Sequence, residues 1–517
     1  MQSNLTLILV SVLLPPAGLY LLWRKHRGSG GSLRAMLLPA AAIVLLGVVE
    51  LFQVYGLRVV LDGSTTRPFF TFSSPSSRDA AVEAHRSSNS PGAVEAPPAP
   101  APAVATPASA SSTALAAAPA PAPAAPPPVE PIGYWTDFRG PNRLGIYDEQ
   151  PIRTDWPAPG LPRLWKQPIG GGYASFAVSG GLAVTIEQRR KNEVVAAYDV
   201  LTGREKWTAS WPGFFSESMG GDGPRTTPVI EGGRVYALGA EGELRVLDAA
   251  TGKAVWNKNI LTDNGANNIT WGQSASPLVV DSKLIVLPGG GGGKSVVAYD
   301  KLTGRKLWSV LDDEQSYASP VVATLAGQRQ LLIISAQRAM GLDPEDGRLL
   351  WDFPWVTEYN INATHPIVVA PNRFFISSGY DHGAAVVELT PDGGKFKTRV
   401  VWQNKRMKNK FNDSVLYQGH LYGLDDGILA CVNAETGQQM WKGGRYGFGQ
   451  LLLASGHLVV ISERGELALV KASPSGHQEV ARFDAISGKT WNHPAIAGGV
   501  LLVRNTEEMA AFRIGKP

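Results

Sequence analysis

The 517-residue chain contains one cysteine, Cys431, and this scarcity excludes several kinds of structure. A single thiol can form neither an intramolecular disulfide framework nor a cysteine-based zinc cluster. Cys431 lies in an apolar segment where we expect a strand, so we expect a buried, inert thiol. A strong charge excess is also lacking. The net charge of +4, with 18% charged residues, is too mild to indicate nucleic-acid binding.

Convincing helical periodicity is absent from the C-terminal two-thirds of the chain. From Tyr134 onward, short apolar runs of strand length alternate with turn residues. The 57 glycines and 38 prolines suit a turn-rich all-β protein together with a proline-rich segment.

Long apolar runs occur near the N-terminus, at residues 4–23 and 35–57, with Arg24-Lys25-His26-Arg27 between them. Each run is long enough to cross a bilayer, and the basic loop should be cytoplasmic. A cleaved signal peptide fits less well, because no basic region precedes the first run. We therefore expect residues 1–60 to form a two-helix transmembrane anchor. The chain would be a multi-pass protein of the bacterial inner membrane, with its C-terminal domain on the periplasmic or extracellular side.

Residues 61–131 form the next predicted segment, which is rich in alanine and proline, most densely from 96 to 128. Such a composition cannot bury a core. We expect a disordered linker that tethers the remaining domain, residues 132–517.

That domain contains a repeat, first seen as Ala197-Tyr198-Asp199-Val200-Leu201-Thr202-Gly203-Arg204-Glu205-Lys206-Trp207. The tryptophans of successive copies are 49, 52, 43 and, across one weaker copy, 90 residues apart. In each copy an Asp or Asn opens a turn, a Gly supplies the positive φ, and the next strand ends on Trp. The repeat positions to which we assign structural roles are Asp199, Gly203, Trp207, Asp248, Gly252, Trp256, Asp300, Gly304, Trp308, Asp343, Gly347, Trp351, Gly437 and Trp441.

Each repeat predicts four antiparallel strands, which is one propeller blade, and eight blades can be counted. The last blade lacks an outer strand, and Arg163-Leu164-Trp165-Lys166 could supply it from the N-terminal side. Seven blades remain the alternative, because the copy around Phe483 is degenerate. The expected fold is thus an all-β, eight-bladed propeller that follows two transmembrane helices and a disordered linker.

Binding specificity should come from positions where one blade differs from the next. The residues that open the innermost strands should form a polar ring at one mouth of the axial channel, and aromatic and cationic residues precede them. We expect partner binding at Arg225, Trp271, Tyr317, His365, Asp413 and His493. Solvated residues without a ligand are the alternative. A metal site is not expected, because two or three blades separate the His and Asp positions.

The repeated Ala-Tyr-Asp-x-x-Thr-Gly-x-x-x-Trp pattern resembles the tryptophan-docking repeat of pyrroloquinoline quinone (PQQ)-like propellers, over residues 134–514. This resemblance implies a fold shared by quinoprotein dehydrogenases and by non-enzymatic proteins. One of the latter is the propeller lipoprotein of the outer-membrane β-barrel assembly machinery. The sequence departs from that lipoprotein in its two apolar runs and in having no lipidated cysteine near its start.

The enzymatic members of this family typically use a disulfide of adjacent cysteines, a calcium ion held by Glu, Asn and Asp, and an Asp base. With Cys431 alone the disulfide cannot form, and no positions match the calcium set. We therefore expect a non-catalytic binding or assembly scaffold of the cell envelope, with no catalytic residue and no cofactor. Its partner would be an envelope protein or cell-surface component. A PQQ-dependent oxidoreductase acting on an alcohol or sugar remains the alternative.

Overall fold

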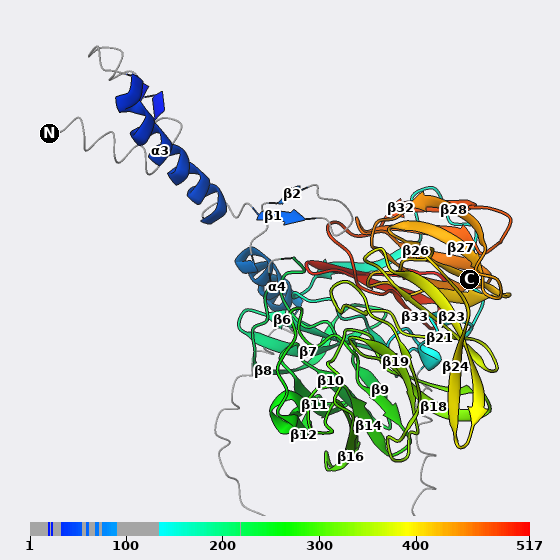
Figure 1. The fold of residues 1–517 in the computed structure, drawn as a ribbon. Helices are drawn as coiled ribbons and strands as arrows, with labels where there is room; N and C mark the ends of the chain where they lie inside the picture. The colour runs from blue at the N-terminus through cyan, green and yellow to red at the C-terminus, as the bar shows by residue number, and fades with distance from the viewer. Residues whose placement is uncertain are drawn as a thin grey trace, which may run out of the picture.

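The computed structural model describes residues 19–20, 22–23, 33–53, 58–61, 68–71, 75–89, 134–217 and 219–516. Within the last two ranges, the strands form eight sheets that make one rounded body (Figure 1). The first strands of most neighbouring sheets contact one another, as β33 contacts β5 and β5 contacts β9, so they line a common axis. The eight-bladed propeller is therefore confirmed.

Each blade consists of four antiparallel strands. In chain order, blade 1 contains β5 (Ala177–Ser179), β6 (Leu182–Arg189), β7 (Asn192–Asp199) and β8 (Glu205–Pro212). Blade 2 contains β9 (Val229–Glu231), β10 (Arg234–Leu238), β11 (Glu243–Asp248) and β12 (Ala254–Asn259), followed by the short helix α5 (Ile260–Asn264). Blade 3 contains β13 (Leu278–Val280), β14 (Lys283–Val286), β15 (Val296–Asp300) and β16 (Lys306–Val310). Blade 4 contains β17 (Val321–Leu325), β18 (Gln328–Ile334), β19 (Arg338–Leu342) and β20 (Leu349–Pro354).

The second half of the ring repeats this order. Blade 5 contains β21 (Ile367–Ala370), β22 (Arg373–Ser378), β23 (Gly383–Asp392) and β24 (Lys395–Asn404). Blade 6 contains β25 (Val415–Tyr417), β26 (His420–Asp425), β27 (Ile428–Asn433) and β28 (Gln439–Arg445). Blade 7 contains β29 (Gln450–Ala454), β30 (His457–Ile461), β31 (Glu466–Lys471) and β32 (Glu479–Asp484). Blade 8 contains β33 (Ala495–Ala497), β34 (Val500–Arg504), β35 (Glu508–Arg513) and β4 (Arg163–Pro168).

The ring closes through strand β4, which comes from the N-terminal side of the domain. This strand pairs antiparallel with β35, and Trp165 lies opposite Ala511. The outer edge of β35 is thereby covered, and the first and last parts of the domain share one sheet. The strand predicted around Trp165 occupies this place.

The repeat joins neighbouring blades through its tryptophan. Trp207 donates its Nε1–H to the carbonyl of Ala249 at 3.0 Å, in the turn of the next blade. Gly252 in that turn has a φ of 70°, and a Cβ there would overlap the Trp207 indole. Equivalent bonds run from Trp165 to Val200, Trp256 to Lys301, Trp402 to Ala434 and Trp441 to Ser473. Trp351 departs from this arrangement, because it donates to Gln330 of its own blade at 2.6 Å.

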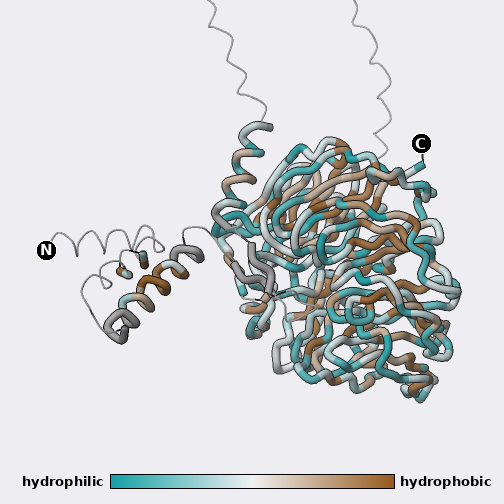
Figure 2. The backbone as a smooth tube through the Cα atoms, turned by 90° about the horizontal axis from the view of Figure 1, so that it is seen from above, coloured by the Kyte–Doolittle hydropathy of each residue, from teal (hydrophilic) through white to brown (hydrophobic). Residues whose placement is uncertain are grey.

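The turn aspartates act within their own hairpins. Asp199 accepts hydrogen bonds from the amides of Leu201 and Thr202, at 3.1 and 3.0 Å. This is the side-chain turn expected from the repeat. Apolar strand residues fill the space between blades, and Cys431 is fully buried among them. Figure 2 shows hydrophobic stretches running through the propeller and along α3 (Leu33–Gln53).

The structure does not support the anchor that the sequence predicts for the N-terminal region. Among the residues that the structure describes, no helix is long and apolar enough to cross a membrane. The two-helix anchor and the multi-pass inner-membrane location are therefore not supported. The first expected span, residues 4–23, lies almost entirely outside the described residues, and the second overlaps α3.

The expected disordered linker also needs correction, because three ordered elements lie within residues 61–131 or at its edge. Strands β1 (Arg58–Leu61) and β2 (Pro68–Thr71) pair as a hairpin, and helix α4 (Pro75–Asn89) packs beside blade 1 (Figure 1). Its first residue, Pro75, suits a helix start because proline lacks the N–H that would remain unpaired there. The alanine- and proline-rich part, residues 96–128, lies outside the described residues.

Candidate functional site: the mouth of the axial channel

The axial channel is filled by the residues that precede the ring. We call residues 134–147 the plug. The carbonyls of Trp135 and Thr136 accept the amides of Val178 and Ile230, at 2.7 and 2.8 Å, on the innermost strands of blades 1 and 2. At its other end, β3 (Ile146–Tyr147) pairs in parallel with β29 of blade 7. The plug thus satisfies backbone groups that the inner strands would otherwise leave unpaired.

An arginine ties the plug to two further blades. Arg143 lies at the end of the short helix η1 (Pro141–Arg143) and is 1% exposed. Its guanidinium donates to the carbonyls of Ser276 and Pro320, at 3.3 and 2.8 Å, and pairs with Asp137 at 2.8 Å. A guanidinium suits this place because its donors fan out in one plane.

A second arginine meets the polar positions that the repeat analysis singled out. Arg139 Nη1 lies 3.0 Å from the Asp413 carboxylate, and the two side chains are 2% and 3% exposed. Asp413 also accepts the His365 amide at 3.0 Å. Phe138 packs edge-on against the rings of His365 and His493, with centroids 5.8 and 5.0 Å apart. These contacts form one buried cluster of plug and propeller residues.

This burial changes the interpretation of half of the predicted binding residues. His365 and Asp413 are 5% and 3% exposed, and the side chain of His493 is 11% exposed. Burial, together with Arg139, holds the pKa of His493 well below its usual value. These three residues face the plug and not the solvent. A partner at the mouth would therefore meet the residues around them.

The residues around them form an aromatic and cationic ring. Tyr173 stacks on Trp491 at 5.4 Å, and Trp491 contacts Phe411 at 4.5 Å. Lys489 lies 4.1 Å from the Trp491 ring centroid, and burial lowers the pKa of this lysine to about 8. Phe448, Lys410, Tyr380 and Tyr359 continue these contacts. We call the mouth ring the set Tyr173, Trp271, Tyr317, Tyr359, Tyr380, Lys410, Phe411, Phe448, Lys489 and Trp491.

The other three predicted residues lie at this mouth. Trp271 and Tyr317 contact each other with centroids 5.4 Å apart. Arg225 lies over the Phe215 ring at 4.4 Å and pairs with Glu217 at 3.3 Å, with only 9% of its side chain exposed. Arg225 therefore holds a surface loop in place more than it presents charge to a partner.

Exposed apolar side chains complete the mouth, and the sequence analysis missed them. Phe214 and Met219 lie between blades 1 and 2, while Val356 and Tyr359 lie between blades 4 and 5. Their exposed fractions are 50%, 53%, 53% and 60%. Several exposed apolar side chains at one mouth make it a candidate surface for binding another molecule. In the sequence they lie in two of the longer inter-blade connections, residues 213–228 and 355–366.

A hollow of about 380 Å³ lies between the innermost strands of blades 4 and 5, on the plug. Leu144 of the plug, 43% exposed, lines it together with Arg143, His365 and the strands β17 and β21. The sequence carried no signal for this hollow, because it depends on where the plug leaves space.

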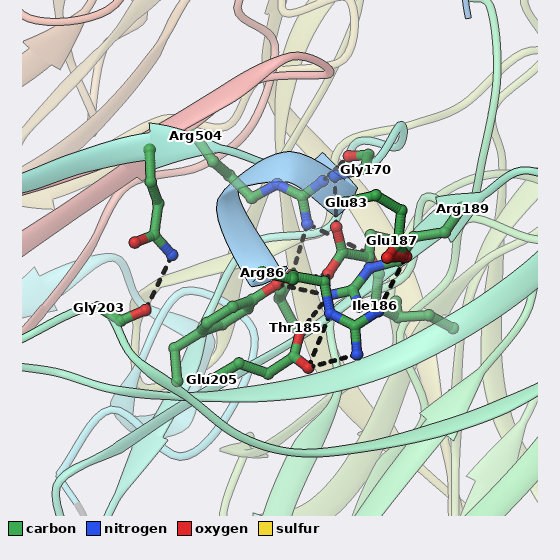
Figure 3. Close-up of polar contacts among 12 residues, drawn as sticks. Glu83, Arg86, Gly170, Thr185, Ile186, Glu187, Arg189, Gly203, Glu205 and Arg504 are labelled. Carbon is green, nitrogen blue, oxygen red and sulfur yellow. Dashed lines mark hydrogen bonds and ion pairs between the residues drawn. The ribbon is translucent and has the colours of Figure 1, made fainter. Parts of the chain in front are cut away.

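The seam between blades 8 and 1 carries a charged network under helix α4 (Figure 3). Arg189 of blade 1 pairs with Glu187 at 2.7 Å and with Glu205 at 2.8 Å. Arg86 of α4 reaches the same Glu205 at 2.8 Å. Arg504 of blade 8 donates to Thr185 at 2.6 Å, next to this group. Burial disfavours ionised Glu187, but Arg189 and Arg504 outweigh it and hold the pKa of that carboxyl below its usual value.

Comparison with known proteins supports the repeat reading. A family model described as outer membrane protein assembly factor BamB matches residues 190–443. The assembly factor of this name from Shewanella oneidensis is 21% identical over 321 residues, which cover 58% of this chain and 76% of the relative. The one from Yersinia pestis is also 21% identical, over 322 residues, with the same coverage.

Among solved structures, the quinohemoprotein alcohol dehydrogenase of Comamonas testosteroni superposes with a TM-score of 0.53 at 14% identity. The superposition covers 74% of this chain and 81% of that enzyme. At such identity the likeness concerns the fold alone. Together, the eight blades, the tryptophan-docking repeat and these matches support the PQQ-like β-propeller family for this chain.

Proposed function

We propose that the chain is a non-catalytic assembly scaffold of the bacterial cell envelope that captures an envelope protein at the mouth ring. The observation that carries this proposal is the contrast between the filled axis and the exposed mouth. The polar groups on the axis are occupied by the plug, whereas Phe214, Met219, Val356 and Tyr359 are half exposed or more. Exposed aromatic and Met side chains are enriched in the cores of protein–protein interfaces, and Trp and Tyr are frequent hot-spot residues.

The relatives favour assembly as the role. They are named outer membrane protein assembly factors, and the chain covers about three-quarters of their length. The propeller supplies a rigid body in which the repeated positions hold blades together. Loops at the mouth then differ from blade to blade and can be specific for one partner.

The alternative function is that of a quinone-dependent dehydrogenase. It is suggested by the fold that this chain shares with the superposed alcohol dehydrogenase. The axial residues do not fit a quinone held in the channel. Asp413, the acidic group expected at the axis, is ion-paired with Arg139 and adjoins the ring of Phe138 through His365. A substrate would have to displace the plug to reach it. Adding PQQ and calcium to the purified chain and assaying alcohols and sugars with an artificial electron acceptor tests this reading, and cofactor-dependent turnover would overturn the scaffold proposal.

Photo-crosslinking in envelope preparations tests the scaffold itself. A photoreactive amino acid at position 359, in the mouth, should crosslink one envelope protein. The matched control is position 201, where Leu201 is 57% exposed on a repeat hairpin away from the mouth ring. We expect Tyr359→Ala to reduce capture by a factor of about 5 or more, the size of an ordinary interface aromatic. Equal crosslinking from both positions would contradict the proposal.

A further inference from the structure

The loop between β8 and β9 borders the mouth and is held from outside its own blades. We call its described residues, 213–217 and 219–225, the rim loop. It carries the exposed side chains of Phe214 and Met219. Lys489, from the connection between blades 7 and 8, donates to the carbonyl of Met219 at 3.0 Å. Tyr173 donates to the carbonyl of Gly220.

Helix α4 supplies another hold on this loop. Arg78, near the start of α4, pairs with Asp222 at 3.2 Å, and the side chains are 12% and 6% exposed. Asp222 in turn accepts the hydroxyl of Ser216 at 2.7 Å, across the loop. The neighbouring Asp79 accepts the amide of Arg190 at 3.1 Å, on the turn after β6. The N-terminal end of α4 is therefore joined to the mouth.

The C-terminal end of the same helix is joined to the seam between blades 8 and 1. Arg86 pairs with Glu205 of β8 (Figure 3). His85 lies 3.1 Å from Gln167 of β4. Arg78 and Arg86 are eight residues apart, which corresponds to about 12 Å along α4. Because a helix is stiff over this length, loosening one end should loosen the other.

The contact surface of α4 is mainly polar. Val82 is the buried apolar side chain that α4 contributes, at 4% exposure, among those of its side chains that the structure describes. The other contacts between α4 and the propeller are ion pairs and hydrogen bonds. Salt screens such ion pairs, and partly exposed ones contribute little to stability. In sequence, 44 residues separate Asn89 from Tyr134, so α4 is not fixed by a short connection to the propeller. Polar contacts of this kind would allow α4 to dock reversibly.

We propose that α4 is a reversibly docked strut whose seating at the blade 8–blade 1 seam orders the rim loop and thereby sets the shape of the mouth. The inference rests on the proposed role of the mouth as the binding surface, and it adds the means by which the N-terminal region controls that surface. When α4 is seated, Arg78 holds Asp222 and the loop presents Phe214 and Met219 in one arrangement. When α4 leaves, Asp222 loses this partner, and the loop keeps its contacts with Lys489, Tyr173 and Arg225.

Amide hydrogen exchange of the full chain tests the coupling without any partner. The reporters in the rim loop are the amides of Gly221 and Gly223, which donate to the carbonyls of Glu217 and Phe215 at 2.9 Å. The variant is Arg86→Ala, because Arg86 contacts the seam, and its partners Glu83 and Glu205 lie outside the loop. We expect exchange to rise about threefold or more both in α4 and at Gly221 and Gly223. The matched control is Arg482→Ala, which removes a similarly exposed pair with Glu479 and should leave both segments unchanged.

The unmodified chain gives a second test that does not depend on a variant. Raising the salt concentration from about 0.05 to about 0.5 M should increase exchange in α4 and in the rim loop together. Faster exchange in α4 with unchanged Gly221 and Gly223 would overturn the strut. The proposal would also be overturned if neither Arg86→Ala nor salt changed the exchange rates of the α4 amides. Crosslinking from position 359, which lies outside the rim loop, tests the proposed function separately, so its failure would leave this coupling standing.

Discussion

The buried pair of Arg139 and Asp413 should account for much of the stability of the plug. Asp413→Asn keeps an oxygen for the His365 amide but removes the charge that faces Arg139 at 3.0 Å. The guanidinium would then be charged, buried and without a counter-ion. Breaking a buried ion pair from one side costs about 3–5 kcal/mol, so we expect a loss of that size.

A double-mutant cycle separates the pair from its surroundings. Arg139→Met leaves Asp413 without its arginine and should also cost about 3–5 kcal/mol, part of it because the carbonyls of Leu144 and Ser414 lose a donor. The variant with both changes contains no lone buried charge. It should be more stable than the sum of the single losses predicts, by about 2 kcal/mol or more.

The assay is urea unfolding of the full chain followed by tryptophan fluorescence, together with amide exchange at Val178 and Ile230. These two amides bond to the plug and report on it directly. Asp300→Asn is the control, because Asp300 lies in an exposed turn and Asn can accept the same amide bonds. Additive losses, with a coupling under about 0.5 kcal/mol, would refute the idea that this pair holds the plug.

Two further predictions concern the blades. Gly252→Ala should lower the free energy of unfolding by about 1–3 kcal/mol more than Gly233→Ala does. Both glycines have a φ of 70°, but only at Gly252 would a Cβ overlap Trp207. Equal melting temperatures of the two variants would contradict the tryptophan docking. Glu193 accepts bonds from Trp211 and Ala240, and burial raises its pKa to about 7, above its usual value of 4.5. The folded state therefore binds this proton more tightly, and stability should fall as pH rises from about 4.5 to 7. Glu193→Gln should flatten this part of the stability profile, measured by urea unfolding at several pH values, and an unchanged slope would count against the buried carboxyl.

The blade count and the closing strand were predictable because their signals are local. A turn such as that of Asp199 and Gly203 needs particular residues at particular offsets, and the docking of Trp207 repeats with the blade. Each blade meets only its neighbours in the same way, so one pattern, repeated, determines the whole ring. The strand at Trp165 was found by the same reasoning, since a blade without an outer strand leaves an exposed edge.

The plug and α4 were missed because their signals are not local. Arg139 and Arg143 lie in a short, irregular segment, and their partners Asp413 and Pro320 are contributed by blades far along the chain. For the same reason, the ring of His365, Asp413 and His493 was expected at an accessible mouth. Only the packed structure shows that the chain itself fills that space.

Helix α4 is a polar segment of low hydrophobicity, which by composition alone suggests disorder. Its order depends on Asp222 and Glu205, more than 100 residues away in sequence.

The sequence by itself determined the architecture of this protein, because a repeat encodes turns and inter-blade contacts over short distances. The tertiary structure alone decided which polar residues are buried, which apolar ones are exposed, and what the N-terminal helix binds, because ion pairs and burial depend on segments that only folding brings together.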